Sequence, residues 1–301
     1  MMKRAIISSV GLAFGANFAS ASGLFGPVGD FNVIIRDNYI ASNSDVEGRA
    51  AIGGNLEVQN YSFASGIGST SGVSLSVGGD FKYTNGQVFQ GNVRTRDTTP
   101  TISGFTVLNG SFFPASGLSV WVPTLVTEMV ARSGFVGNAS IDGSTSLSSG
   151  GTLTLSGGSG SVRYFKVSAA QLANANTIKI NAPSSATVVV NVTGSSVTMS
   201  NSGISLLGGV TESSVLFNFY QATALTVSGI NIRGSVLAPQ ASLVFNNGQI
   251  NGQVVAKSMS GNGEFHYDPF CGSVPVPEPA SMVALALGGI GLARARRKKS
   301  K

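Results

Sequence analysis

A short pattern that recurs along the chain constrains the fold more than any other feature. Residues 52–58 read IGGNLEV and are matched twenty-five residues later by residues 77–83, VGGDFKY. In both copies an apolar residue enters a Gly-Gly turn, an Asn or Asp follows, and apolar and polar residues then alternate. A second repeat, at eighteen residues, relates 234–239 (GSVLAP) to 252–257 (GQVVAK). Periods near twenty, with one or two short strands each, predict the stacked rungs of a parallel β-helix.

The composition also indicates an all-β protein but leaves one alternative fold open. Charged residues make up 11% of the chain and hydrophobic residues 42%, which is too apolar and too nearly neutral for a disordered chain. β-Branched residues between frequent Gly and Asn favour many short strands with tight turns. A β-sandwich is the alternative, because it uses short strands and turns at similar spacings.

One helical segment is expected to interrupt the strands. Apolar residues recur with helical spacing over 123–132, Pro123 suits the first turn of a helix, and Gly134 suits the cap after its end. This pattern predicts a short helix that packs on an end or side of the sheet. Residues 144–161, rich in Ser, Gly and Thr, are expected to form a short strand between flexible turns.

The N-terminus has the three parts of a secretory signal peptide. Lys3 and Arg4 form a positive start, residues 5–18 are mostly apolar, and Ala19 and Ala21 flank Ser20 in an A-x-A-like cleavage site. We therefore expect residues 1–21 to be removed and the mature chain to begin at Ser22.

The C-terminus has an apolar run, residues 280–293, that is short for a membrane span. As a helix it would reach about 21 Å, against about 30 Å for the core of a bilayer. Basic residues follow in the tail 294–301, where the positive-inside rule places them in the cytoplasm: Arg294, Arg296, Arg297, Lys298 and Lys299. The pattern predicts a marginal, temporary membrane segment; a permanent membrane tail is the alternative.

The motif Pro277-Glu278-Pro279 precedes that apolar run and completes a three-part signal. It resembles the PEP-CTERM sorting signal of Gram-negative bacteria, which a membrane transpeptidase, exosortase, processes. The resemblance makes 271–279 a linker and sorting motif and implies exosortase as a partner. It further implies transient anchoring in the inner membrane, followed by display on the outer surface or release into the extracellular matrix.

The charge of the protein is concentrated in these two targeting segments. The formal net charge is +6, but two of the nineteen basic residues lie in the signal peptide and six in the tail. Residues 22–277 keep eleven basic and twelve acidic residues, a net charge of −1, so no nucleic-acid partner is indicated. Cys271 is the single cysteine, which excludes an intramolecular disulfide. We expect it to be buried rather than paired with another chain.

Two groups of polar residues could support chemistry. Glu264, His266 and Asp268 alternate and would share one face of a strand, where they could bind a metal or act as acid and base. Asp45 and Glu47 form a similar pair, although a Glu47–Arg49 ion pair is the simpler interpretation. Neither pattern defines a catalytic or metal site, so we expect no cofactor, no metal and no enzymatic activity.

Aromatic side chains are a better indication of a binding face, although most are expected in the core. Six aromatic residues are candidates for stacking on sugars or anchoring partner proteins: Phe112, Phe113, Trp121, Tyr61, Tyr83 and Tyr220. Threonines do not recur at the period of the repeats, so the sequence gives no indication of the regular threonine face that ice binding would require.

From residue 31 onward the chain resembles the choice-of-anchor A family of exported domains. The matching segments follow in order: 31–33 (FNV), 45–55 (DVEGRAAIGGN), 188–194 (VVVNVTG), 216–219 (LFNF), 234–239 (GSVLAP), 248–256 (GQINGQVVA) and 264–266 (EFH). The resemblance implies one β domain over 22–270, with a structural or adhesive role, and supplies no catalytic residues. We expect a surface or matrix protein that binds extracellular polysaccharide or matrix proteins in a biofilm. An enzyme that processes matrix polysaccharide is the alternative.

Overall fold

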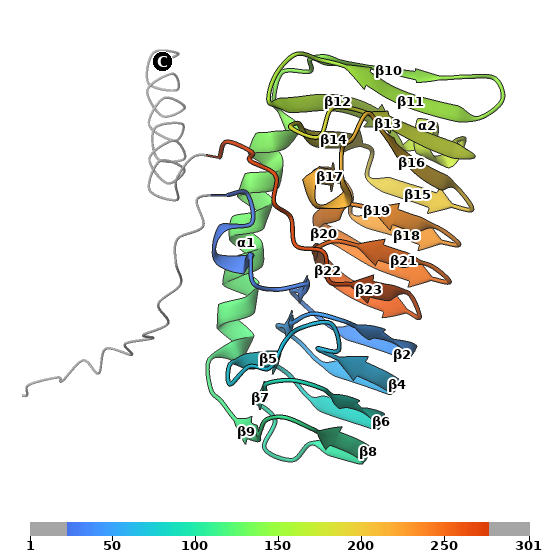
Figure 1. Cartoon of the computed structure of the whole chain (residues 1–301). Coiled ribbons are helices and arrows are strands. Elements are labelled where there is room, and N and C mark those ends of the chain that lie inside the picture. Colours follow the sequence, from blue (N-terminus) through green and yellow to red (C-terminus); the bar gives the residue numbers. More distant parts are fainter. Residues whose placement is uncertain (1–22, 277–301) are drawn as a thin grey trace, which may run out of the picture.

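Most strands pair in parallel with a strand one rung away instead of with their neighbour in sequence. In the computed structural model, which describes residues 23–276, the twenty-five-residue repeat places Ile52 opposite Val77. The eighteen-residue repeat places Val236 opposite Val254. The prediction of a parallel β-helix is confirmed, and the β-sandwich alternative is wrong (Figure 1).

The strands form a lower and an upper stack. The lower stack contains β1 (Val33–Ile35), β2 (Tyr39–Val46), β3 (Ala50–Ile52), β4 (Leu56–Phe63), β5 (Val73–Val77), β6 (Phe81–Val88), β7 (Asn92–Thr95), β8 (Thr101–Val107) and β9 (Phe112–Pro114). The upper stack contains β10 (Gly143–Leu147), β11 (Thr152–Gly157), β12 (Val162–Ser168), β13 (Thr177–Asn181), β14 (Thr187–Thr193), β15 (Ser196–Ser200), β16 (Gly203–Leu207), β17 (Val215–Asn218), β18 (Ala224–Ser228), β19 (Asn231–Arg233), β20 (Ser235–Asn246), β21 (Gln249–Asn251), β22 (Val254–Gly261) and β23 (Glu264–His266). Short 3-10 turns lie at Gly26–Val28 and Glu212–Ser214.

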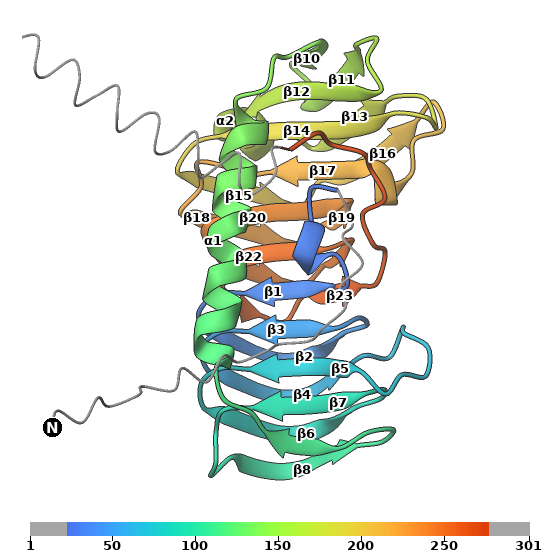
Figure 2. The same ribbon diagram turned by 90° about the vertical axis from the view of Figure 1, so that its left-hand side faces the viewer.

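The two stacks meet at a seam that joins the first rung to the last. The chain begins in the middle of the molecule and descends to β8 and β9, after which helix α1 (Leu118–Gly137) carries it back to the top. The upper stack then descends until β22 pairs with β1 and β2, with Val33 opposite Val254 and Tyr39 opposite Met259 (Figures 1 and 2). Neighbours at the seam are therefore more than two hundred residues apart in the chain.

Each rung has three sides around an apolar interior. The helix face, which Figure 2 shows under α1, runs from β12 and β14 through β22 and β1 to β7. The ladder face consists of β15, β18, the ends of β20 and β22, and the starts of β2, β4, β6 and β8. The third face includes β19, β21, β23 and the ends of β2, β4, β6 and β8.

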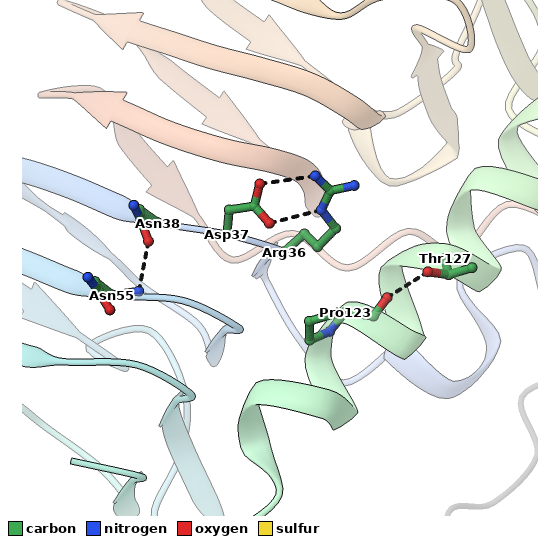
Figure 3. Close-up of polar contacts among 6 residues, drawn as sticks. All are labelled: Arg36, Asp37, Asn38, Asn55, Pro123 and Thr127. Atoms are coloured by element: carbon green, nitrogen blue, oxygen red, sulfur yellow. Dashed lines mark hydrogen bonds and ion pairs between the residues drawn. The ribbon is translucent and has the colours of Figure 1, made fainter.

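Helix α1 is twice as long as the sequence predicts and covers both stacks. It has 20 residues and begins after Gly117, which adopts a left-handed conformation with φ 81°. Pro123 and Gly134 therefore lie inside the helix, not at its ends, and Thr127 donates a hydrogen bond to the Pro123 carbonyl at 2.9 Å (Figure 3). Burial of Leu118, Val122 and further apolar residues up to Val136 against the sheet explains the extra length.

The helix contacts the two stacks in different ways. Over the lower stack the backbones approach closely, since a Cβ at Gly78 would lie 2.8 Å from Ser119 Cα. Over the upper stack a buried polar network joins them. There the Asn218 amide donates to the Ser133 carbonyl at 3.0 Å and to Asn191 Oδ1 at 2.8 Å, and Asn191 donates to the Val136 carbonyl at 2.9 Å.

Asparagine ladders hold the corners between rungs. At the turn that enters the ladder face, Asn38 Oδ1 accepts a hydrogen bond from the Asn55 backbone at 3.0 Å, beside the Arg36–Asp37 ion pair (Figure 3). At the far corner, Asn60 donates to Asn43 Oδ1 at 2.9 Å. Both far-corner residues are left-handed, with φ of 50° and 55°, a conformation that asparagine tolerates better than most residues.

Two further segments differ from the sequence prediction. The Ser/Gly/Thr-rich region forms two strands, because β10 and β11 pair as an antiparallel hairpin. A second helix, α2 (Ala169–Ala173), begins with a capping box between Ser168 and Gln171. Within residues 23–276 no helix is long and apolar enough to cross a membrane. The predicted signal peptide, the motif Pro277-Glu278-Pro279, the membrane segment and the basic tail lie outside the described residues.

Candidate binding face

The ladder face presents regular columns of outward side chains. Adjacent strands lie about 4.8 Å apart, so its eight strands extend over roughly 34 Å. One column, next to the Asn43–Asn60 corner, contains only hydroxyl and amide side chains. Its members are Ser200, Ser228 and Asn246 above the seam, and Ser42, Gln59, Thr84 and Ser103 below it.

The neighbouring column is more mixed. From top to bottom it contains Thr198, Thr226, Val244, Ser260, Ile40, Glu57, Lys82 and Thr101. Its upper part is uncharged, while Glu57 and Lys82 form an exposed ion pair in the lower stack. Thr198 and Thr226 lie in register although twenty-eight residues separate them, so the stacking of threonines is limited to one pair in this column.

A shallow groove of about 540 Å³ crosses the seam on this face. Asn246 and Asn262 line it from above the seam, and Ser42, Gln59 and Thr84 line it from below. The groove therefore combines hydrogen-bonding groups from both ends of the chain. Its charged members are Glu57 and Lys82, which neutralise each other.

The predicted polar cluster lies on the third face, away from this groove. Glu264 and His266 share one side of β23, and the His266 imidazole lies 3.4 Å from the Glu264 carboxylate. Asp268 lies beyond the end of the strand, where burial, and then the nearby carboxylate of Glu212, raise the pKa of its carboxyl. Across the described residues, no three His, Cys, Asp or Glu side chains are placed to hold one metal ion.

The second predicted pair, Asp45 and Glu47, lies next to that cluster. Burial raises the pKa of the Asp45 carboxyl, a hydrogen bond from Ser65 opposes this, and the carboxylates of Glu264 and Glu47 raise it further. The Glu47 carboxylate accepts a hydrogen bond from the Tyr267 backbone at 2.9 Å. The structure places no ion pair between Glu47 and Arg49, which instead donates to Thr70 at 3.3 Å. Glu47 therefore links the two stacks on the third face, whereas Asp45 bonds Ser65 within the lower stack.

Several of the candidate binding residues have structural roles. Tyr61 and Tyr83 are 1% and 0% exposed and lie inside the solenoid, where the Tyr61 hydroxyl contacts that of Tyr39 at 2.6 Å. Trp121 packs edge-on against Phe31 between the helix and the N-terminal segment. The expectation for Cys271 is wrong: its side chain is exposed, because the segment after β23 runs along the outside of the solenoid.

Both ends of the described chain lie on the helix side of the molecule. Arg132 of α1 donates to the carbonyls of Gly23 and Leu24, each at 2.9 Å. Phe25 packs edge-on against Phe270, and Val274 is buried in the same cluster. The ladder face is therefore on a different side from the points where the chain enters and leaves the domain. The ladder-face columns cannot be recognised in the sequence, because rungs of different length obscure their spacing.

Comparison with known families assigns both parts of the chain. Residues 24–267 match the family described as "Putative Ice-binding-like adhesive domain". Residues 275–298 match the PEP-CTERM protein-sorting motif, which confirms the resemblance seen in the sequence. The choice-of-anchor A resemblance is compatible with the first of these matches. No curated protein matches the chain significantly.

Matches to solved structures of ice-binding proteins cover most of the chain at low identity. A glycosylated ice-binding protein from an Arctic yeast has 16% identity and a TM-score of 0.42, and the match covers 85% of this chain and 95% of that one. An ice-binding protein from the Antarctic ascomycete Antarctomyces psychrotrophicus has 12% identity, a TM-score of 0.39, and coverage of 81% and 96%. A Shewanella frigidimarina ice-binding protein domain has 14% identity, a TM-score of 0.39, and the same coverage.

The assignment therefore rests on the family match, which spans the β-helix from its first to its last strand. This chain belongs to the ice-binding-like adhesive domain family and ends in a PEP-CTERM protein-sorting motif.

Proposed function

We propose that this protein is an adhesin of the extracellular matrix or biofilm whose ladder face binds polysaccharide. Export to the cell surface follows from the sorting motif and the adhesive family. In the proposal the signal peptide ends at Ala21, residues 280–293 insert transiently into the inner membrane, and exosortase processes the chain near Pro277-Glu278-Pro279. The domain then remains outside the cell.

The column of seven hydroxyl and amide side chains is the observation that carries this proposal. A polysaccharide presents hydroxyl groups at regular intervals, and a regular row of donors and acceptors can bind them one rung after another. Each neutral hydrogen bond contributes only about 0.5–1.5 kcal/mol, so affinity would come from the number of contacts. The groove across the seam provides a concave surface in which the polysaccharide can lie.

The lining of the groove favours a binder over a polysaccharide-processing enzyme. A glycosidase needs two carboxyl groups roughly 5 to 9.5 Å apart across the scissile bond. Glu57 is the one carboxylate in the groove lining, and it is paired with Lys82. The enzyme alternative has its own test, since it requires new reducing ends to appear when the exported protein is incubated with matrix polysaccharide.

Polysaccharide binding can be tested with a double variant on the ladder face and a control variant on the third face. We expect the exported protein to co-sediment with the polysaccharide of its own cells. Gln59→Ala combined with Thr84→Ala should weaken the affinity about tenfold to thirtyfold, the effect of two lost hydrogen bonds. Gln87→Ala changes a glutamine of β6 on the third face and should bind like the parent. Equal affinities for all three proteins would refute the role of the ladder face.

The sorting step needs a separate measurement of mass and location. In cells with exosortase, the exported species should begin near Ser22 and end near Glu278. In an exosortase-deletion strain we expect the C-terminal tail to stay on the protein and the protein to stay with the membrane. An intact tail in both strains would make the C-terminus a permanent anchor and remove the case for release into the matrix.

Ice is a second candidate ligand, favoured by the family description and by the in-register pair Thr198 and Thr226. Val244, Ile40 and the Glu57–Lys82 ion pair interrupt that column further down. We therefore expect little thermal hysteresis from the exported protein. A clear depression of the freezing point, abolished by Thr226→Lys, would instead identify the upper ladder face as an ice-binding surface.

A further inference from the structure

The two ends of the solenoid are finished in different ways. At the upper end the β10–β11 hairpin covers the core, since Gly143 lies against the ring of Phe165, which is fully buried. At the lower end Figures 1 and 2 both show β8 as the last strand of the stack. The rings of Phe105 and Phe112 close the interior there, and both remain partly exposed.

The lower end combines apolar surface with unpaired backbone. Ile102 and Leu108 are 41% and 48% exposed. Within residues 23–276, β8 pairs with β6 on its upper side and with no strand on its lower side. One row of its N–H and C=O groups therefore points away from the stack, as in any edge strand. Terminal rungs of repeat proteins normally carry a polar cap, and this one does not.

This edge also lacks the charges that usually prevent edge strands from pairing. From residue 98 to residue 127 the sequence contains no Asp, Glu, Lys, Arg or His. Natural proteins place charged side chains, lysine above all, on edges that must stay single. Residues 98–117 of this uncharged stretch form the uncovered end, and the remainder begins α1. The absence of charge from that end favours an edge that is paired in the working protein.

We infer that β8 is a homodimer interface, through which two copies meet end to end about a two-fold axis. A two-fold axis places each patch against its own copy and makes the paired strands antiparallel. A charged edge would then face like charges, whereas this neutral edge is complementary to itself. A second β8 supplies both a row of backbone donors and acceptors and an apolar cover for Ile102 and Leu108. A lipid surface offers no such backbone row.

Pairing of this kind would give the assembly two ladder faces. The contact is one strand wide, which places it among small and weak interfaces, so we expect a dissociation constant on the order of 10 µM. Two faces held in one particle raise the avidity for a long polymer without any new contact to it. The dimer rests on the geometry of the lower end and stands or falls separately from polysaccharide binding.

Sedimentation equilibrium of the exported protein between about 1 and 100 µM tests the dimer. The parent should pass from monomer to dimer over this range. Ile102→Lys places two like charges at the contact and should raise the dissociation constant at least tenfold. Val120→Lys is the matched control, because Val120 is 69% exposed on α1, and it should dimerise like the parent. A parent that stays monomeric at 100 µM, or an Ile102→Lys variant that dimerises normally, overturns the inference.

A cysteine at the edge tests the two-fold arrangement without disturbing the core. In a Cys271→Ser background, Ser103→Cys on β8 should form a disulfide-linked dimer under mild oxidation, whereas Ser242→Cys on β20 should not. Head-to-tail stacking would produce species larger than dimers and would leave Cys at position 103 uncrosslinked. Either of those results excludes the end-to-end dimer.

Discussion

The lower and upper stacks share one backbone register but differ in where their buried polar side chains lie. In the lower stack the polar groups are inside the solenoid, where the Tyr39 and Tyr61 hydroxyls pair at 2.6 Å and Tyr83 donates to the Tyr61 carbonyl at 2.6 Å. In the upper stack the largest buried rings are phenylalanines, and the polar network of Asn191 and Asn218 lies outside the sheet, under α1.

The comparison shows that the rung geometry does not depend on a particular core. Both stacks place parallel strands in register across the seam, although Tyr39 on one side faces Met259 on the other. The backbone ladders and the asparagine corners are common to both halves, while the interior side chains differ. Mutations at matched positions of the two stacks can therefore separate two contributions to stability. One comes from the backbone ladders and asparagine corners, and the other from the interior side chains of each stack.

The largest difference is expected for Tyr61→Ala against Phe217→Ala. Both substitutions remove a ring that is at most 1% exposed, which costs about 3–5 kcal/mol of unfolding free energy. Tyr61→Ala also leaves the Tyr39 hydroxyl without its partner, at a further cost of about 1–3 kcal/mol. Unfolding in urea measures both values. A smaller loss for Tyr61→Ala than for Phe217→Ala would show that the tyrosine pair does not stabilise the lower core.

A smaller difference is expected beneath the helix. Asn218→Ala leaves the polar groups of Ser133 and Asn191 unpaired and should cost about 2–3 kcal/mol. Ser76 occupies the same column of the helix face in the lower stack, and we expect Ser76→Ala to change the stability by less than about 0.5 kcal/mol. The same unfolding experiment compares them, and equal losses would contradict the assignment of the network to the upper stack.

A still smaller difference in stability is expected between the asparagine corners of the two stacks. The Asn60 side chain donates to Asn43 and accepts from Asn85. The Asn247 side chain makes one such bond, accepting from Asn262, while its backbone N–H donates to Asn262 Oδ1. Both residues are left-handed, so replacement by alanine adds backbone strain of about 1–2 kcal/mol at either corner. We expect Asn60→Ala to exceed Asn247→Ala by about 1 kcal/mol, the value of one hydrogen bond. Thermal unfolding of the two variants measures this difference in stability. A larger loss for Asn247→Ala would argue against a stabilising role for the asparagine ladder at the far corner.

The smallest effect is expected on the surface. Lys82→Ala breaks the exposed ion pair with Glu57 and should change the stability by less than about 1 kcal/mol, with no difference at high salt. Thr226→Ala at the same column of the upper stack should be equally mild. A large loss for Lys82→Ala that persists in salt would show that the ion pair has a structural role at the groove.

The sequence was sufficient to predict the rung stacking, because the Gly-Gly turns at 53–54 and 78–79 recur at a spacing equal to one rung. It was insufficient for the order of the rungs, since nothing local marks Val33 as the neighbour of Val254. The helix was underestimated because Pro123 and Gly134, read as helix ends, are tolerated inside it once its apolar side is buried.

The candidate site was predicted only in part. Glu264 and His266 do share a strand face, as their alternation indicates, but Asp268 lies past the strand end. The ladder-face column was missed because its members are unevenly spaced: seventeen residues from Ser42 to Gln59, then twenty-five to Thr84 and nineteen to Ser103. Turns of unequal length absorb the differences, so an even column in space has no single period in the sequence.

The seam also determines when the β-helix can be completed during synthesis of the chain. The first strand of the domain has its upper neighbour in β22, which is the last strand but one to be synthesised. Until residues 254–261 have been synthesised, β1 and β2 have no upper partner. Pairing between strands so far apart in the sequence is also slow. The β-helix is therefore complete only when the segment that precedes the sorting motif is available to pair with β1 and β2.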